Sequence, residues 1–164
     1  MMQSFQQTIR IAARPEEVFS VWSNVSQLQR LVHTIESAEV LDDDTTRWVL
    51  HAPFNLRIAY TAHTVEREEN RRLSWRARHD AQTDGGYQGP VENSGEVVFD
   101  AVGDNGSQTD VHVRIEYDLP GKSAQQVVRA LNALGYPSRE IQHALEEIRD
   151  HVESLQIRPS ASAA

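Results

Sequence analysis

The sequence has 164 residues, of which 39% are hydrophobic and 24% are charged, as in an ordinary globular protein. Its formal net charge of -8 disfavours nucleic acid and anionic membrane surfaces as partners, because binding to phosphates needs clustered Lys and Arg. The absence of Cys excludes disulfides, thiolate nucleophiles and cysteine-ligated zinc. The opening MMQSFQQTIR lacks the pattern of a signal peptide, and no run approaches the about 20 apolar residues of a membrane span, so we expect a cytoplasmic protein without a membrane span.

The first part of the chain predicts one strand followed by two short helices. Residues 4–13 alternate apolar and polar side chains, which is typical of a strand with one buried face. Pro15, followed by Glu16 and Glu17, suits the first turn of a helix, where a missing amide and negative charge are both favoured. Ser26 is a candidate N-cap for a second short helix.

The middle of the chain predicts six further strands linked by tight turns. Alternation of period two marks these strands at residues 34–41, 45–51, 54–65 and 72–79 and in a hairpin at 95–118. Within that hairpin, the pair Asn105-Gly106 predicts a tight turn in which both residues have positive φ. Successive hairpins build an antiparallel meander with one face that must be covered.

The end of the chain predicts helix. Ser123 and Gln126 match a capping box, and Gly135 and Pro137 interrupt the pattern that follows. Apolar residues then recur at steps of three and four over residues 141–155, which indicates one long amphipathic helix able to cover the sheet. We expect a single domain over residues 1–157 and a disordered tail at 158–164.

Several motifs resemble binding or catalytic motifs but are better explained by ordinary structural roles. Residues 121–123 read Gly-Lys-Ser but lack the earlier glycine of a phosphate-binding loop, whose place Glu116 takes. Residues 42–44 are three aspartates without the central glycine and closing glutamate of a calcium loop, and predict a solvated turn. The seven histidines show no metal-ligand spacing, and no GxSxG motif exists, so we expect no metal and no cofactor and identify no catalytic residue.

Five arginines lie close together in this acidic sequence: Arg67, Arg71, Arg72, Arg76 and Arg78. We interpret them as the solvent-facing side of the sheet, balanced by the acidic residues Glu66, Glu68 and Glu69. A patch for an anion or a partner is the alternative interpretation.

The segments PEEVFSVWSNVSQL, ESAEVLDDDTTRWVL, RRLSWRAR, NSGEVVF and TDVHVRIEYDLPG, in this order, resemble the polyketide cyclase/dehydrase branch of the START-like (SRPBCC) superfamily. The resemblance runs from about residue 8 to about residue 155. It implies an α+β helix-grip fold, in which a curved seven-stranded antiparallel sheet wraps around a long C-terminal helix, with two short helices after the first strand. Such proteins hold a cavity between sheet and helix. They include aromatic polyketide cyclases, lipid and sterol carriers, quinone-binding proteins and plant hormone receptors, and no catalytic motif of the aromatic cyclases maps onto this sequence.

The apolar faces raise the question of whether they close into a core or line a cavity. An empty void of about 300 Å³ would cost about 7 kcal/mol, comparable to the net stability of a domain, so a cavity must be collapsed, wet or occupied. Tyr60, Tyr117, His79 and Tyr136 are candidate polar groups for a ligand, because a buried phenol needs a hydrogen-bond partner. The expected ligand-binding residues are Trp48, Tyr60, Trp75, His79, Phe99, Tyr117, Leu131, Leu134 and Tyr136.

Three functions fit these observations. We favour a carrier or sensor that binds a hydrophobic small molecule such as a lipid, a quinone or a polycyclic aromatic. The alternative is a cyclase or dehydratase, in which Tyr60, Tyr117 or His79 polarises a carbonyl or moves a proton. The third is a protein-interaction module, and the sequence is also compatible with a homodimer. The Gly-rich loop at residues 80–90 is either a lid or a plain surface loop.

Overall fold

The computed structural model describes residues 2–52, 56–79, 92–118 and 138–157. Seven strands form one sheet with the order β1-β7-β6-β5-β4-β3-β2, and all neighbouring strands are antiparallel. The strands are β1 (Met2–Ile11), β2 (Ile35–Asp42), β3 (Thr45–Ala52), β4 (Leu56–Glu68), β5 (Arg72–His79), β6 (Glu92–Val102) and β7 (Gln108–Asp118). The described helices are α1 (Pro15–Trp22), α2 (Val25–Leu31) and α4 (Ser138–Ile157), with a short 3₁₀ turn η1 (Asp104–Gly106).

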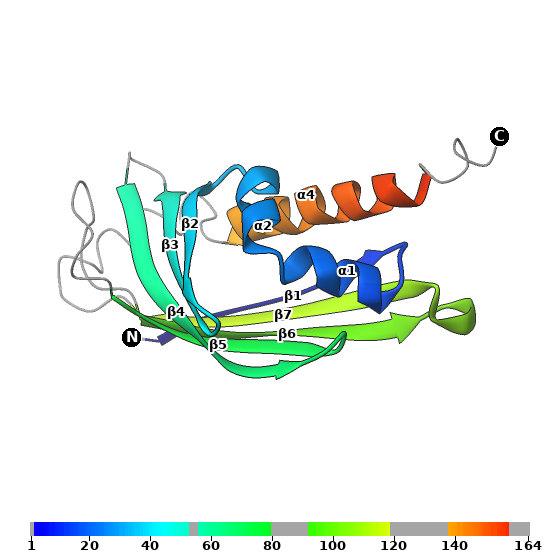
Figure 1. Ribbon diagram of the computed structural model, residues 1–164, viewed down its shortest axis with the longest axis horizontal. Helices are drawn as coiled ribbons and strands as arrows, with labels where there is room; N and C mark the ends of the chain where they lie inside the picture. The colour runs from blue at the N-terminus through cyan, green and yellow to red at the C-terminus, as the bar shows by residue number, and fades with distance from the viewer. Residues whose placement is uncertain (1, 53–55, 80–91, 119–137, 158–164) are drawn as a thin grey trace.

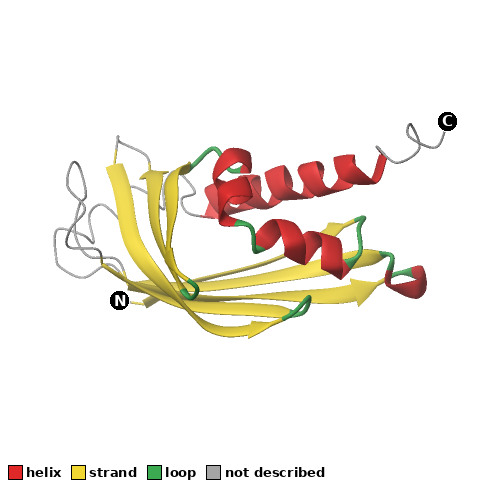
Figure 2. Ribbon diagram, viewed as in Figure 1, coloured by secondary structure: helices red, strands yellow, loops and turns green. Residues whose placement is uncertain are grey.

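The sheet curves strongly, and the described helices lie on its concave side (Figures 1 and 2). The two short helices follow β1 directly, and α4 runs across the open side of the sheet. This arrangement confirms the predicted helix-grip fold. The capping box at residue 123, the loop at 80–90 and the tail at 158–164 lie outside the described residues, and the domain boundary at residue 157 stays a prediction.

The helix starts follow local sequence signals, with one correction. Helix α1 begins at Pro15, as predicted. Helix α2 is capped by Asn24 rather than by Ser26, because the Asn24 side chain accepts a hydrogen bond from the backbone N–H of Gln27 at 3.1 Å. The predicted cap at Ser26 is wrong, since this residue already lies inside the first turn of α2.

The β6–β7 turn differs from the predicted two-residue turn. Val102 pairs with Gln108, so the connection has five residues, of which three form η1. The predicted positive φ values at Asn105 (57°) and Gly106 (67°) are confirmed. A third positive φ, 77° at Gly103, lengthens the turn, because it places an additional left-handed residue before η1.

A tightly packed core occupies the end of the molecule where α1 meets β6, β7 and the second half of α4. Its most buried residues include Phe19, Val111 and Val152, each at most 1% exposed. Phe99 packs edge-on against Phe19 with ring centroids 5.4 Å apart, and against Trp22 at 5.7 Å. This end of the concave face is therefore filled by side chains.

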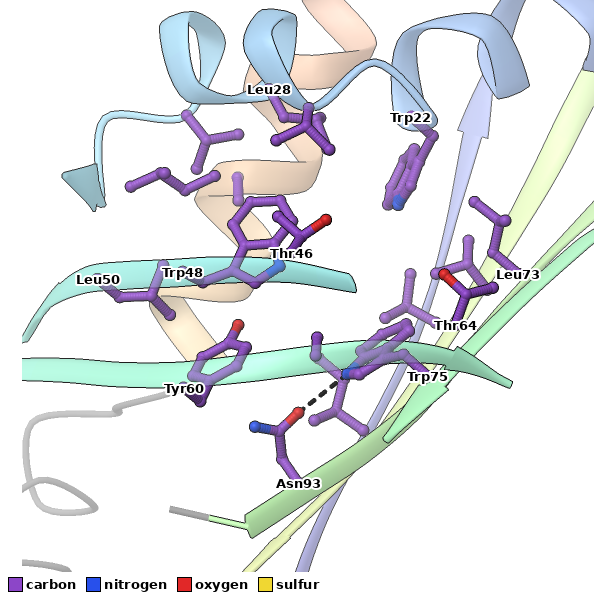
Figure 3. A pocket seen from close by; sticks show the side chains of 18 of the residues that line it. Trp22, Leu28, Thr46, Trp48, Leu50, Tyr60, Thr64, Leu73, Trp75 and Asn93 are labelled. Atoms are coloured by element: carbon purple, nitrogen blue, oxygen red, sulfur yellow. Dashed lines mark hydrogen bonds between the residues drawn. The ribbon is translucent and has the colours of Figure 1, made fainter. Parts of the chain in front are cut away.

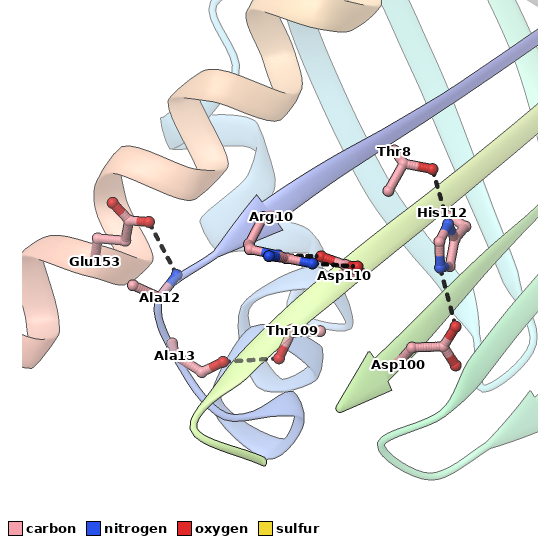
Figure 4. A network of polar contacts seen from close by, with 9 residues as sticks. All are labelled: Thr8, Arg10, Ala12, Ala13, Asp100, Thr109, Asp110, His112 and Glu153. Carbon is pink, nitrogen blue, oxygen red and sulfur yellow. Dashed lines mark hydrogen bonds and ion pairs between the residues drawn. The ribbon is translucent and has the colours of Figure 1, made fainter. Parts of the chain in front are cut away.

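Polar contacts fix the connection between β1 and α1 (Figure 4). The Glu153 carboxylate on α4 accepts the backbone N–H of Ala12 at 2.9 Å. The hydroxyl of Thr109, which is fully buried, donates to the backbone carbonyl of Ala13 at 2.7 Å. Both contacts satisfy backbone groups that leave the sheet at the end of β1.

Most of the arginine cluster is on the outer side of the sheet, as the sequence indicates. Arg72 contacts Glu66 and Glu96, and Arg71 contacts Glu68. The exception is Arg67, whose position is described with the cavity below. Within the described residues, no helix combines the length and the apolar character that crossing a bilayer requires.

Candidate functional site

A cavity of about 500 Å³ lies between the sheet and the helices, beside the packed core (Figure 3). Strands β2 to β7 supply one wall, and the end of α1, helix α2 and the first turns of α4 supply the other. Helix α4 serves both regions of the concave face. Its Ile141 and Ala144 line the cavity, Leu145 stands at the boundary, and Ile148 and Val152 enter the core.

The three tryptophans of the protein all line this cavity. Trp22 comes from the end of α1, Trp48 from β3 and Trp75 from β5. Figure 3 shows their rings, together with the ring of Tyr60, around one common space. Because each tryptophan is only partly buried, aromatic surface remains available for contact with a ligand.

Trp75 is held in place by two neighbours on β6. It pairs with Gly95 across the two strands, and its indole ring occupies the space where a side chain of residue 95 would stand. Its ring N–H donates to the side-chain oxygen of Asn93 at 2.9 Å (Figure 3). The glycine and the asparagine together fix the ring as part of the cavity wall.

Polar side chains are distributed around a wall whose surface is mainly apolar. Thr46, Thr64 and Tyr60 each carry a hydroxyl at its lining (Figure 3). Burial raises the pKa of the Tyr117 phenol, which therefore stays protonated at neutral pH and can donate a hydrogen bond. Such groups can orient a carbonyl or hydroxyl of an apolar ligand. Among the described residues, no three or more His, Asp or Glu side chains form a group that could hold a metal ion.

Arg67 is a lining residue that the sequence pattern misplaced. A β-bulge in β4 makes Val65 an extra residue, because Thr64 pairs with Trp75 while Glu66 pairs with Ser74. The bulge reverses the alternation, so Arg67 lies opposite Leu73 and both line the cavity. The prediction that Arg67 is on the solvent-facing side is wrong for this reason. A signal was present, since the apolar Val65 stands at a position that the strand pattern assigns to solvent.

The Arg67 guanidinium is partly engaged by its surroundings. Its central carbon lies 5.3 Å from the centre of the Phe19 ring. Two of its nitrogens lie 3.4 Å from the same carboxylate oxygen of Glu69. The charge therefore sits at the boundary between the packed core and the cavity, with an aromatic face and a carboxylate as neighbours.

Carboxylates line the cavity at two places. Asp42, the exposed last residue of β2, and Asp43, in the exposed turn to β3, lie at one of them, which confirms the solvated turn predicted there. The backbone N–H of Asp44 and the side chain of Thr45 lower the pKa of Asp42, so this group is ionised. Glu140, in the first turn of α4, lies at the other place.

The segment after α2 is tied to α4 close to Glu140. A Glu147 oxygen accepts the backbone N–H of His33 at 3.1 Å, and the second oxygen of Glu147 contacts the His33 ring. The other ring nitrogen of His33 lies 3.9 Å from Glu140. Since Val32 and Thr34 line the cavity, these contacts join two parts of its wall.

The predicted ligand-binding residues fall into three groups. Trp48, Tyr60, Trp75 and Tyr117 line the cavity, and the structure brings them together. Phe99 is not among the lining residues, because it packs into the core against α1. His79 is the last residue of β5 and pairs with Tyr60, but its side chain is not described. The remaining predicted residues lie outside the described part of the chain: Leu131, Leu134 and Tyr136.

Sequence reasoning did not assign a ligand-binding role to several residues that line the cavity: Trp22, Leu28, Thr46, Thr64, Arg67 and Asn93. Trp22 and Leu28 belong to helical stripes that are as typical of a packed core as of a cavity. The two threonines follow the inward alternation of β3 and β4, and this alternation was a usable signal.

Known proteins share this architecture. A protein from Deinococcus radiodurans is 26% identical, with a TM-score of 0.64, and the match covers 92% of this chain and 97% of that one. The Zhui aromatase/cyclase from Streptomyces sp. R1128 is 15% identical, with a TM-score of 0.71 and coverage of 93% and 94%. A START superfamily protein from Mycobacterium smegmatis is 14% identical, with a TM-score of 0.64 and coverage of 91% and 98%.

Comparison with functionally curated proteins gives no match. The sequence does match the profile of the family described as polyketide cyclase/dehydrase and lipid transport over residues 2–153. Because this match covers nearly the whole chain and the fold agrees with it, the chain belongs to the polyketide cyclase/dehydrase and lipid transport family.

Proposed function

We propose that this protein is a carrier or sensor that binds a hydrophobic small molecule between the sheet and the C-terminal helix. The observation that carries the proposal is the coexistence of a filled core and a cavity of about 500 Å³ on the same concave face. Ligand pockets typically measure about 300–1,000 Å³ and are lined mainly by apolar side chains with a few polar groups. The cavity has both properties.

The energetics support an occupant. The cavity opens to solvent, so it holds either water or a ligand rather than an empty void. Water fills such a space poorly when the wall offers few hydrogen-bonding groups. An apolar molecule gains about 25 cal/mol for each Å² that it removes from water. We assign the ligand contacts to Trp48, Tyr60, Trp75 and Tyr117.

Binding of Nile red, an uncharged hydrophobic dye, tests this proposal. We expect saturable binding at micromolar affinity, with a rise in dye emission and a change in tryptophan emission. The variant Ala144→Phe places a ring where α4 lines the cavity, and it should weaken binding at least about tenfold because the ring takes the space of the dye. The matched variant Ala101→Phe, at an exposed position of β6, should bind as the wild type does. Equal affinities for the two variants would contradict the proposal.

A cyclase or dehydratase is the second candidate function, and the Tyr117 phenol favours it. A phenol that stays protonated in an apolar cavity can donate a hydrogen bond to a substrate carbonyl and stabilise the charge that develops there. The test is turnover of a short aromatic poly-β-ketone, followed by product analysis. Product that forms with the wild type and is lost in Tyr117→Phe, while Nile red still binds, would favour the enzyme over the carrier.

A further inference from the structure

We propose that the cavity discriminates by charge, and that it takes a positively charged planar aromatic molecule in preference to the corresponding carboxylate. This inference rests on the proposed function, because it names the class of ligand for the same cavity. It is carried by two independent features of the lining, which are the aromatic faces and the distribution of charged groups around them.

The first feature is the set of aromatic faces. Trp22, Trp48 and Trp75 come from three different elements and enclose one space together with Tyr60 (Figure 3). The faces of these rings suit planar aromatic ligands, which stack on them. An aromatic face also carries partial negative charge, so it attracts a cation and repels an anion, and indole does so most strongly.

The second feature is the balance of charge. The described lining holds three carboxylates, Asp42, Asp43 and Glu140, against one guanidinium, that of Arg67. Two cationic or hydrogen-donating groups of this lining can favour an anion, Arg67 and the imidazole of His51. Glu69 offsets the charge of Arg67, whose guanidinium lies against the Phe19 ring, and Glu36 lies 3.8 Å from the His51 ring. The described lining therefore carries more negative than positive charge.

The apolar wall makes this balance effective. Charges act over longer distances beside a low-dielectric surface than in bulk water, where salt screens them within about 8 Å at physiological ionic strength. A carboxylate that enters the cavity loses its hydration and is repelled by the lining carboxylates of Asp42, Asp43 and Glu140. An ammonium group meets carboxylates and indole faces, which replace part of the hydration that it loses.

Three anthracenes of nearly equal shape test the inference: anthracenylmethylammonium, anthracenylmethanol and anthracene carboxylate. Anthracene absorbs where tryptophan emits, so energy transfer from the three tryptophans reports binding in the cavity. At low ionic strength we expect the ammonium compound to bind at least about tenfold more tightly than the carboxylate, with the alcohol between them. The difference between the two affinities should shrink as salt is added, since salt screens the carboxylates of the lining.

A charge-neutralising pair of substitutions identifies the origin of the preference. Asp42→Asn with Asp43→Asn should reduce the ratio of the two affinities at least about threefold, and the amide introduced at position 42 still offers an oxygen to the N–H of Asp44. Asp104→Asn with Asp150→Asn removes two carboxylates that do not line the cavity and should leave the ratio unchanged. Glu140→Gln repeats the test from α4, should the turn variants fold poorly.

The outcomes separate the two proposals. Binding of the alcohol supports the proposed function, and absence of binding by all three anthracenes overturns the function and the charge preference together. If the alcohol binds while the carboxylate binds as tightly as the ammonium compound or more tightly, only the charge preference is overturned. The charge preference is also overturned if the Asp42 and Asp43 substitutions leave the ratio of affinities unchanged, because these carboxylates would then not be the source of the preference.

Discussion

The indole ring of Trp75 occupies the place of a side chain at Gly95. A Cβ atom built on Gly95 would lie 2.8 Å from Cε2 of this ring, closer than real Cβ atoms approach their neighbours. The two residues face one another across β5 and β6, and the absence of a side chain on one strand is what lets the ring of the other lie against the sheet. A flat wall of the cavity therefore depends on a glycine that contributes no side chain of its own.

Gly95→Ala should displace the Trp75 ring and break its hydrogen bond to Asn93. We expect a loss of about 1–3 kcal/mol in the free energy of unfolding, as for other overpacked positions, together with a shift in tryptophan emission. Urea denaturation and fluorescence spectra measure both effects. Ser94→Ala, at the neighbouring position on the same strand, should change stability by less than about 0.5 kcal/mol. Wild-type stability and emission in Gly95→Ala would show that the ring is not held in this way.

Thr109→Val should destabilise the protein through the connection between β1 and α1. The threonine hydroxyl is buried and donates to the Ala13 carbonyl, so the substitution leaves a buried acceptor without its partner at a cost of about 1–3 kcal/mol. Thr109→Ser keeps the hydroxyl and should lose only about 0.8 kcal/mol for the missing methyl group. Chemical denaturation of the two variants measures the difference, and equal losses would rule out the hydrogen bond as the cause.

The ion pair between Arg10 and Asp110 should make stability depend on pH in the acid range (Figure 4). The hydrogen bonds that Arg10 donates, at 2.7 and 3.0 Å, lower the pKa of Asp110 in the folded protein. Because the folded pKa lies below the unfolded one, this stabilisation is complete above the unfolded value of about 4 and is lost as pH falls through the folded value.

The variant Asp110→Asn isolates this contribution. The difference in unfolding free energy between the wild type and Asp110→Asn should be constant between about pH 5 and 7 and should shrink below about pH 4. Denaturation curves at several pH values measure it. Asp104→Asn, in the exposed η1 turn, serves as the control for the loss of one surface carboxylate. A difference for Asp110→Asn that grows towards low pH would contradict the assignment.

Two periodicities of the sequence were sufficient to predict the antiparallel strands and the long helix that covers them, and the family resemblance implied the helix-grip fold. Period-two alternation marks the strands from β1 to β7, and the stripe from Ile141 to Leu155 marks the helix that crosses them. The cap of α2 and the β6–β7 turn were less accurate. Both depend on which of two or three adjacent polar residues or glycines takes a special backbone conformation, and neighbouring candidates have similar energies.

The cavity could be predicted only in part. Alternation correctly placed Trp48, Tyr60, Trp75 and Tyr117 on the inner face, and all four line the cavity. Alternation alone does not tell which part of that face is filled, and this depends on how α1 packs. Phe99 shares the inner face but lies where Phe19 covers it.

Arg67 shows a second limit of pattern reasoning. One inserted residue at Val65 changes the face of every residue that follows it in β4. The bulge itself depends on register across two strands, which a single strand's sequence does not contain. Contacts with Leu73 and Phe19 reveal it only once the strands are paired.

Native mass spectrometry of the purified protein, before and after organic extraction, tests the central claim most directly. We predict a bound species in addition to the protein mass, which extraction removes and whose chemistry names the ligand class. The same experiment on Ala144→Phe should show little or none of it, because the added ring fills the cavity. A protein mass without any bound species, combined with failure of Nile red to bind, would contradict the claim that this cavity is a ligand site.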